Sequence, residues 1–463
     1  MLSKVFKAYD VRAIYPDPLG ETEAWKIGVA AGRFFADHPE KPGGKRSNTV
    51  AVSRDMRPSA PAMAKALIDG LRAGGVDVVD LGMCDTSIQY FAVPHLDCAG
   101  GIQVTASHNP VEYIGFKFSG PQAKPIGADS GLKDIQAIAE TIGNPGTIEP
   151  TGEYEEMDLW DAYREHVLKF LEPLQREVTV FVDASNGMAG KLVPKVFDNI
   201  PNLKIIPLNF EITGSFVHEP NPLKAENMVY TQQGVKDHGA DFGACFDGDA
   251  DRCMLVDDKG ENIGCDHLTA LFCDHFVPMN PGTTVVFDLR SSKVVEEKIA
   301  ETGATPRKGR VGHVFMKATL RETGAAFGGE LSGHFYFKQN NCCDSGAIAF
   351  AVVLSILGKT DRSLSELIDP LRKYPQSGEI NFEVEDKEGV MKSLASEYGD
   401  DGETDWLDGV SADCWEKRGF WFNVRPSNTE PLLRLNAEAK DQSTLDALLE
   451  ELQPKLGKPA EGH

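Results

Sequence analysis

The sequence predicts an α/β protein built from several domains, and three observations support this fold class. The chain has 463 residues, whereas an average domain has roughly 100–200, so about three or four domains are expected. Strand-like and helix-like segments alternate through the first two-thirds of the chain, which is typical of βαβ units with parallel or mixed sheets. After about Tyr374 the pattern changes, because residues 379–384 alternate as a strand and residues 419–424 are aromatic and strand-like. This last part is therefore expected to be a separate α+β domain.

The alternation falls into three cycles of strands and helices. In the first cycle, strands are expected at residues 48–53, 76–81 and 101–105, with a helix at 60–72. In the second cycle, a helix at 159–171 precedes strands at 178–183, 204–208 and 241–246. The third cycle has a strand at 284–288 and helices near 293–301, 314–322 and 347–357. Three further stretches are interpreted as loops or linkers, at residues 121–127, 143–152 and 400–405.

Composition and charge restrict the function classes. Hydrophobic residues make up 41% of the chain and charged residues 25%, which is ordinary for a globular protein. The formal net charge of −23 argues against a nucleic-acid partner, because binding to phosphate backbones requires a basic face. A small phosphorylated substrate is still compatible with this charge if Arg and Lys side chains gather locally.

Targeting signals are not visible in the sequence. No apolar run reaches the roughly 20 residues needed to span a bilayer, so no membrane partner is expected. The N-terminus lacks the apolar core and small-residue cleavage site of a secretion signal. The nine cysteines are odd in number and irregularly spaced, which favours a reducing cytoplasm over a disulfide framework. The oligomeric state is left open, and a monomer is compatible with the sequence.

Four polar loops hold the residues suited to chemistry, and the first is the segment TASHNP at residues 105–110. A simple turn is one explanation, because Ser and Asn side chains next to proline bond the local backbone. A catalytic role would require a serine hydroxyl that accepts and returns a phosphoryl group beside an acid–base group. Ser107 is the candidate for the hydroxyl, and both His108 and Lys117 are candidates for the general base.

The second loop is DGDADR at residues 247–252, directly after an apolar run. Asp247, Asp249 and Asp251 stand at alternate positions and can converge on one hard cation, since their negative charges would otherwise repel. A calcium-binding EF-hand is excluded by Arg252 at the sixth position, which requires glycine, and by Asp258 instead of glutamate at the twelfth. Magnesium is favoured, because it needs few protein carboxylates when a phosphate supplies another oxygen.

The third loop is GELSGH at residues 329–334. Glu330, Ser332 and His334 offer an acceptor, a hydroxyl and an imidazole between glycines, which suits binding to sugar hydroxyls. A structural turn explains the same residues at least as well, so this loop alone does not establish a binding site.

The fourth loop is RPSNTEP at residues 425–431. Arg425 lies beside the side chains of Ser427, Asn428 and Thr429, and these groups together with backbone N–H groups can bind a phosphate. The alternative is a turn or a helix cap, with Ser427 or Asn428 as the N-cap residue.

Together, and in this order, the four loops resemble the phosphoserine, metal, sugar and phosphate-binding signatures of the α-D-phosphohexomutase superfamily. The segment FKAYDVR at residues 6–12 also resembles the start of that family, so the resemblance covers essentially the whole chain. It implies three related α/β domains with mixed sheets and a C-terminal α+β domain, arranged around a central active-site cleft. The domains expected to hold the four loops, in the same order, span residues 1–153, 154–257, 258–372 and 373–463.

Within the superfamily, the chain is most similar to the phosphomannomutase/phosphoglucomutase branch. Asn428 supports this placement, because phosphoglucosamine mutases usually have glycine there, and Leu331 replaces the glutamine usual in those mutases. Two departures from the family pattern are small. Ala250 replaces a common glycine in the metal loop without being a ligand, and Ala13 replaces another glycine after the YDVR segment.

The resemblance implies a role for each matching residue. Ser107 would be the phosphorylated residue, and Asp247, Asp249 and Asp251 would hold Mg²⁺ together with the phosphate on Ser107. Glu330 and Ser332 would contact sugar hydroxyls. The residues expected to bind the phosphate that does not react are Arg425, Ser427, Asn428 and Thr429. A less specific set, expected to serve acid–base chemistry and anion binding, comprises Tyr9, Arg12, Lys117, Arg252, Arg290 and His313.

The implied reaction interconverts hexose 1-phosphate and hexose 6-phosphate, with mannose, glucose or both as the sugar. Phosphoserine donates its phosphoryl group, hexose 1,6-bisphosphate forms as intermediate and activator, and its other phosphate returns to Ser107. Alternatives are phosphoglucosamine mutase and a sugar-phosphate phosphatase in which Ser107 is only a turn residue. A non-catalytic sugar-phosphate-binding protein is a further alternative, but it would not need a transferable phosphoryl group.

Overall fold

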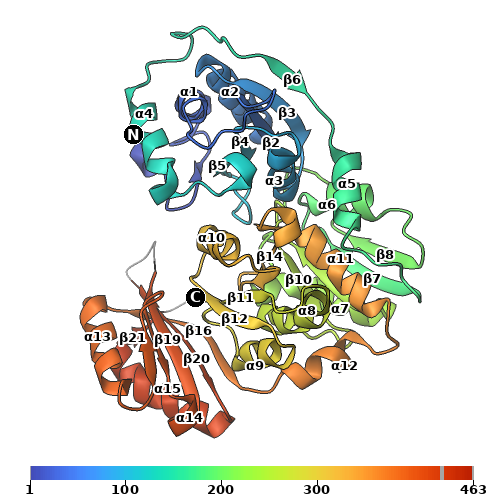
Figure 1. The fold of residues 1–463 in the computed structure, drawn as a ribbon, viewed down its shortest axis with the longest axis vertical. Helices are drawn as coiled ribbons and strands as arrows, with labels where there is room; N and C mark the ends of the chain where they lie inside the picture. Colours follow the sequence, from blue (N-terminus) through green and yellow to red (C-terminus); the bar gives the residue numbers. More distant parts are fainter. Residues whose placement is uncertain (1, 428–431, 461–463) are drawn as a thin grey trace. The chain divides into compact units, whose positions relative to one another are not determined.

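The computed structural model describes residues 2–427 and 432–460, and strands and helices alternate along most of the chain (Figure 1). The chain divides into two compact units. Unit 1 comprises Met1–Ile263, Leu320–Phe327 and Ser332–Ser365, and unit 2 comprises Gly264–Thr319, Gly328–Leu331 and Glu366–His463. In the part of the chain that the structure describes, no helix combines the length and the apolar character needed to cross a membrane.

Unit 1 begins with a six-stranded mixed sheet in the order β1-β5-β4-β2-β3-β6. β2 pairs in parallel with both β3 and β4, whereas β5 runs antiparallel to β4 and β1. The strands are β1 (Val11–Ile14), β2 (Thr49–Arg54), β3 (Asp77–Met83), β4 (Gly100–Val104), β5 (Tyr113–Ser119) and β6 (Tyr154–Glu156). The helices are α1 (Glu21–Ala36), α2 (Ala60–Ala73), α3 (Thr86–His95) and α4 (Leu132–Thr141), with short turns η1 (Leu2–Lys4), η2 (Pro121–Ala123) and η3 (Ala128–Ser130). Because β2 and β4 are parallel neighbours, the loops that follow them begin at the same edge of the sheet.

Helices α1 and α2 pack closely because glycines lie where they face each other, Gly28 and Gly32 in α1 and Gly70 in α2, with Gly74 directly after α2. A Cβ atom placed on Gly28 of α1 would lie 2.3 Å from the carbonyl oxygen of Leu67. A Cβ atom on Gly70 of α2 would lie 2.2 Å from the carbonyl oxygen of Trp25. Backbone therefore packs directly on backbone at this crossing, and no larger side chain fits.

We expect Gly28→Ala to destabilise unit 1 by about 2 kcal/mol. Overpacking here should cost about 3 kcal/mol, the upper end of the usual range, because the added atom meets backbone rather than a side chain that could move. The higher helix propensity of alanine offsets about 1 kcal/mol of this cost. The midpoint of thermal unfolding, followed by calorimetry, would measure the effect. Gly43→Ala is the control, because within the described part of the chain its added Cβ would meet no atom within 4 Å apart from its own chain neighbours. Equal midpoints for Gly28→Ala and the wild type would show that the two helices separate without cost.

The second sheet of unit 1 has four strands in the order β10-β9-β7-β8. β7 pairs in parallel with β8 and β9, and β10 runs antiparallel to β9. The strands are β7 (Val178–Asp183), β8 (Leu203–Leu208), β9 (Phe242–Phe246) and β10 (Cys253–Val256). The helices of this part are α5 (Trp160–Leu168), α6 (Ala189–Phe197) and α7 (Ala225–His238). The DGDADR loop is the short connection between β9 and β10.

An apolar helix, α11 (Gly346–Leu357), completes the core of unit 1 beside this sheet. Its Phe350 ring contacts the rings of Phe197, Phe242 and Phe246, with centroids 4.9, 5.8 and 5.9 Å away. Preceding α11 in unit 1 are β14 (Phe335–Phe337), η4 (Lys338–Asn340) and β15 (Cys343–Asp344), the two strands pairing antiparallel.

Unit 2 contains a parallel pair of strands, β11 (Thr284–Asp288) and β12 (Thr305–Gly309), with α8 (Cys265–Met279) and α9 (Lys293–Glu301). Three elements fall on unit boundaries, namely α10 (His313–Thr323), β13 (Phe327–Gly329) and α12 (Leu364–Ile368). The 3₁₀ turn η5 (Asp369–Leu371) leads to the C-terminal part of the chain.

The C-terminal part is a six-stranded antiparallel sheet in the order β17-β18-β19-β20-β16-β21, coloured orange to red in Figure 1. Its strands are β16 (Gln376–Glu383), β17 (Glu403–Asp405), β18 (Val410–Asp413), β19 (Phe420–Pro426), β20 (Leu432–Ala439) and β21 (Lys458–Pro459). The helices are α13 (Lys387–Tyr398), α14 (Trp415–Arg418) and α15 (Gln442–Leu456). Apolar residues of α13 and α15 form a core with β19 and β20.

The mixed α/β sheets and the antiparallel C-terminal sheet confirm the predicted fold class. Every predicted strand and helix of the three cycles is present, most with bounds within one or two residues. Two expected loops also contain regular structure. The 3₁₀ turn η2 begins the expected loop at 121–127, and β17 occupies the second half of residues 400–405. β17 is three residues long, too short to give a recognisable alternation.

Candidate active site

Ser107 lies in the loop after β4 and is buried. Its backbone is left-handed, with φ at 50°, and its N–H donates to Thr105 Oγ1 at 2.8 Å. The hydroxyl donates to Asp247 Oδ2 at 3.1 Å and lies 3.2 Å from Nδ1 of His108. Gly248 fits against the same residue, since a Cβ there would lie 2.4 Å from the Ser107 carbonyl oxygen. The first and second predicted loops therefore meet at the Ser107 side chain.

The three aspartates of the second loop converge as predicted. Oxygen atoms of Asp247, Asp249 and Asp251 all lie within 4.8 Å of one another, and all three residues are buried. Ala250 is left-handed, with φ at 57°. A glycine would adopt this conformation without strain, so Ala250 costs some stability but leaves the three carboxylates in place.

Two basic side chains compensate part of this negative charge. Lys117 Nζ lies 2.7 Å from Asp249 Oδ2 and 2.6 Å from Asp251 Oδ2. Arg252 donates to Asp247 Oδ2 from Nε and Nη2, at 2.9 and 2.8 Å. Three carboxylates against two cations leave one negative charge that these residues do not compensate.

The pKa values of the carboxylates reflect this imbalance. Burial opposes ionisation of all three, but Lys117 holds the pKa of Asp249 below its usual value and that of Asp251 at about 2. Desolvation raises the pKa of Asp247 to about 8 despite the neighbouring Arg252. The third carboxylate therefore needs either a proton or a further cation near neutral pH.

A divalent cation fits this donor set. Oδ1 of Asp249 and Oδ1 of Asp251 are buried and have no hydrogen-bond partner among the residues that the structure describes. Buried carboxylate oxygens of this kind are costly to leave unsatisfied. Carboxylate oxygens are the ligands that hard cations such as Mg²⁺ prefer. The acidic triad is thus a candidate metal site.

Of the other predicted residues of unit 1, His334 lies beside the triad and Arg12 lies beside the Ser107 loop. His334 Nε2 lies 3.7 Å from Asp251 Oδ1, and its Nδ1 is 2.8 Å from Ser332 Oγ. Arg12 in β1 donates from Nη1 to the side-chain oxygen of Asn109 at 2.7 Å, beside the Ser107 loop. Tyr9 lies in the bend before β1 and is half-buried.

Unit 2 brings together a second group of predicted residues. Glu330 is buried, and its Oε1 accepts from the N–H of Gly312 at 3.0 Å, directly before His313 at the start of α10. Arg290 forms an ion pair with Asp288, whose Oδ2 also accepts from the N–H of Leu331 at 3.2 Å. The Asp288 carboxylate therefore binds both Arg290 and the backbone of Leu331, the residue directly after Glu330.

The described part of the fourth loop has a strongly basic environment. Glu379 Oε2 lies 2.6 Å from Arg425 Nη2 and 3.3 Å from Arg290 Nη1, and its Oε1 lies 2.9 Å from Arg434 Nη1. Arg434 also donates to Ser427 Oγ at 3.3 Å. Burial opposes the charge of Glu379, but Arg425 and the other guanidinium groups lower its pKa. This position therefore favours an anion. Two of the predicted phosphate ligands, Asn428 and Thr429, lie outside the described residues.

Several residues at these places were not predicted. His334 Nε2 also lies 3.6 Å from Asp344 Oδ2, and Thr86 donates to Asp249 Oδ2 at 2.5 Å. Glu379 and Arg434 add charge beside Arg425. The four motifs do not include Asp344, Thr86, Glu379 or Arg434, and no local sequence signal distinguishes these four from ordinary helix or strand residues.

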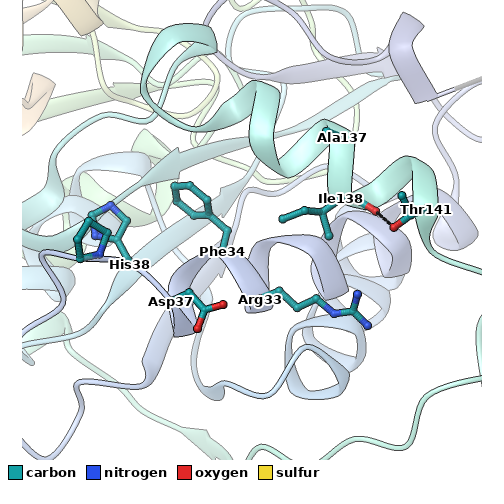
Figure 2. Close-up of a pocket in the computed structure, with 8 residues that line it drawn as sticks. Arg33, Phe34, Asp37, His38, Ala137, Ile138 and Thr141 are labelled. Carbon is teal, nitrogen blue, oxygen red and sulfur yellow. Dashed lines mark hydrogen bonds between the residues drawn. The ribbon is translucent and has the colours of Figure 1, made fainter.

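A cavity of about 650 Å³ between α1 and α4 does not contribute to this site (Figure 2). Phe34 and Ile138 supply much of its apolar lining, with Arg33, Asp37 and His38 around them. None of these residues belongs to the triad or to the four predicted loops.

Comparison with known proteins agrees with this arrangement. Models of phosphoglucomutase/phosphomannomutase α/β/α domains I, II and III match residues 3–145, 161–260 and 265–374, and the model of the C-terminal domain matches residues 379–455. The chain belongs to the phosphoglucomutase/phosphomannomutase family. It is therefore an enzyme of the isomerase class, an intramolecular phosphotransferase with phosphohexomutase function.

Relatives of this mutase are similar along their whole length. Phosphohexose mutases of Xanthomonas campestris pv. campestris (strain B100) are 38% identical over 96% of this chain and 97% of theirs. A phosphomannomutase of Vibrio cholerae serotype O1 is 36% identical over 95% of each chain. A crystal structure of a phosphoglucomutase/phosphomannomutase family protein from Burkholderia thailandensis superimposes with a TM-score of 0.88, at 32% identity over 98% of both chains.

Proposed function

We propose that this mutase interconverts the 1- and 6-phosphates of mannose, glucose or both through a phosphoserine at Ser107. The observation that supports this best is the position of the Ser107 hydroxyl, 3.1 Å from a carboxylate of the buried acidic triad. A hydroxyl used only in a turn would not require three buried carboxylates and two cations, Lys117 and Arg252, beside it. Hexose 1,6-bisphosphate is the intermediate that this route requires.

The triad residues Asp247, Asp249 and Asp251, with the phosphate on Ser107, are proposed to hold Mg²⁺. When bound, the metal would stabilise negative charge on the transferring phosphoryl group. Lys117 and Arg252 serve the same end, since they are fixed cations in a buried site where charge is poorly screened. Lys117 is therefore assigned to charge compensation, because two carboxylates already bind its ammonium group.

In the proposed transfer step, the phosphoryl group moves from Ser107 to the sugar and a proton moves to the serine oxygen. Burial holds the pKa of His108 well below its usual value, so the imidazole starts neutral and can accept a proton. The attacking sugar hydroxyl bonds to phosphorus and its proton passes to His108, while the bond between phosphorus and Ser107 Oγ breaks. His108 lies 3.2 Å from Ser107 Oγ and passes a proton on to that leaving oxygen, and the return step runs the same transfers in reverse. A loose, anionic transition state makes positioning and charge the main contributions.

The remaining residues are proposed to bind the substrate. Glu330 and Ser332 would contact sugar hydroxyls, and Arg425, Ser427, Asn428 and Thr429 would bind the phosphate that does not react. His334, in the same loop as Glu330 and Ser332, is also proposed to bind substrate. Anion binding and proton transfer are proposed for Tyr9, Arg12, Arg290 and His313.

Boundaries near 153, 257 and 372 are proposed for the four domains. A cytoplasmic location remains a prediction from the cysteine pattern.

An assay with mannose 1-phosphate and glucose 1-phosphate tests the proposal. With Mg²⁺ and a trace of hexose 1,6-bisphosphate, we expect 6-phosphates to form with little free phosphate, and the peptide containing Ser107 to gain one phosphoryl mass. The ratio of the two rates gives the sugar preference. Release of inorganic phosphate without 6-phosphate would support the phosphatase alternative, and faster turnover of glucosamine 1-phosphate would support phosphoglucosamine mutase.

We expect Arg425→Ala to raise KM for the hexose phosphate by about 10- to 100-fold. Hydrogen bonds to charged groups contribute about 1.5–3 kcal/mol, and this interaction is made in both the ground state and the transition state. Steady-state kinetics on both sugars would measure KM and kcat separately. A matched control is Arg362→Ala, at an exposed residue of unit 1. An unchanged KM in Arg425→Ala would remove this residue from the phosphate site.

A further inference from the structure

Arg57 is a fully buried arginine in the loop that follows β2. Its side-chain Nε lies 3.1 Å from Asp55 Oδ2, and its backbone N–H donates to Asp55 Oδ1 at 2.9 Å. The ring of Phe216 covers one face of the guanidinium group, with its centroid 5.6 Å from the guanidinium carbon. Arginine is rarely buried without full compensation of its donors, so the contacts of the remaining N–H groups show what this side chain does.

Those contacts are all made to the backbone of the Ser107 loop. Nη2 of Arg57 donates to the carbonyl oxygens of Ser107 and Asn109, at 2.8 and 2.7 Å. Nη1 donates to the carbonyl oxygens of Pro110 and Tyr113, at 2.5 and 3.1 Å. One planar guanidinium group therefore binds four carbonyl groups between the end of β4 and the start of β5.

The Ser107 loop has a conformation that requires such support. Ser107 is left-handed, a region that residues with a Cβ atom rarely occupy unless the surroundings impose it. The carbonyl that Arg57 binds and the hydroxyl that faces Asp247 belong to this same residue. Rotation of the backbone at Ser107 would thus move the hydroxyl away from the triad.

We propose that Arg57 is a positioning residue for phosphoryl transfer, which holds the Ser107 backbone so that the hydroxyl faces the acidic triad. The proposal rests on the proposed function of Ser107. Arg57 does not contact the reacting atoms, and it affects the reaction only by binding backbone carbonyl groups of the Ser107 loop. Lysine cannot replace it, because an ammonium group lacks the planar fork that reaches Asp55 and four carbonyl oxygens at once.

Arg57→Lys tests the proposal because it keeps the positive charge beside Asp55. We expect kcat to fall by about 100-fold, since a displacement of about 1 Å in a reacting group has this effect, while KM stays within about threefold. The rate at which hexose 1,6-bisphosphate phosphorylates Ser107 in a single turnover should fall by the same factor as kcat. Arg33→Lys, at an exposed position of α1, is the matched control and should leave both rates unchanged.

Hydrogen exchange gives a readout that does not depend on activity. In Arg57→Lys, the amides of Ser107, Asn109 and Tyr113 should exchange at least tenfold faster, whereas those of β7 should not change. A kcat within threefold of the wild type, or unchanged exchange in this loop, would overturn the positioning role. Absence of both mutase activity and phosphoserine in the wild type would instead overturn the proposed function of Ser107.

If Arg57→Lys does not fold, hydrogen exchange in the wild-type protein tests the proposal instead. If Arg57 holds the loop, the wild-type amides of Ser107, Asn109 and Tyr113 should exchange as slowly as those of β4. Exchange as fast as in the surface loop at residues 143–147 would overturn the proposal.

Discussion

Ser107→Ala should lower mutase turnover of both mannose 1-phosphate and glucose 1-phosphate by at least ~10⁴-fold. Loss of the nucleophile in a serine hydrolase costs about 10⁶-fold in kcat, and here the hydroxyl must also carry the phosphoryl group between two half-reactions. The fold should persist, because alanine has the same Cβ atom as serine and therefore the same preference at φ 50°. Coupled assays of 6-phosphate formation and the mass of the 105–113 peptide would measure the two effects.

Ser393→Ala is the matched control, because Ser393 is exposed on α13. This substitution should leave turnover unchanged. Ser107→Ala that retains more than a tenth of the wild-type turnover would contradict the phosphoserine route. Loss of 6-phosphate formation together with continued release of inorganic phosphate would point to the phosphatase alternative. The two products therefore have to be measured in the same reaction.

The sequence predicted those parts of the site whose functional side chains lie close together along the chain. Asp247, Asp249 and Asp251 lie within five residues, so their mutual repulsion already indicated a cation. β7 was predicted with its observed bounds, Val178–Asp183, because a short run rich in valine and phenylalanine is a strong strand signal. No strand was predicted at β1, which has only four residues, too few to show a period.

The sequence could not predict contacts that depend on distant segments. Arg57 is 50 residues from Ser107 and binds carbonyl oxygens, which every residue has, so no pattern of side chains marks the interaction. The roles of His108 and Lys117 were also left open, because both are near Ser107 in the chain. The proposed mechanism gives them different roles because Lys117 Nζ binds carboxylates 132 and 134 residues away, whereas His108 lies beside the Ser107 hydroxyl.

Asp249→Asn should weaken the binding of Mg²⁺ by at least ~100-fold and lower kcat/KM by about 10²- to 10³-fold. Two unit charges 4 Å apart at an effective dielectric constant of about 20 interact by about 4 kcal/mol. A divalent cation loses more electrostatic attraction than this when one of its carboxylate ligands becomes an amide. Isothermal titration with Mg²⁺ or Mn²⁺ would measure the affinity without reference to turnover. Asp361→Asn, at an exposed loop position, is the control for the loss of one negative charge.

The stability of the metal-free protein distinguishes a lost metal site from a damaged fold. Lys117 and Arg252 compensate only two of the three buried carboxylates, so Asp249→Asn removes the excess negative charge and Lys117 keeps Asp251 as a partner. We therefore expect the thermal midpoint without metal to be equal to or higher than that of the wild type, while the stabilisation caused by Mg²⁺ is lost. A midpoint that falls by several degrees without metal would show that Asp249 mainly supports the fold through Lys117. Unchanged Mg²⁺ affinity would show that the cation binds elsewhere, and the acidic triad would then have to be explained by its ion pairs alone.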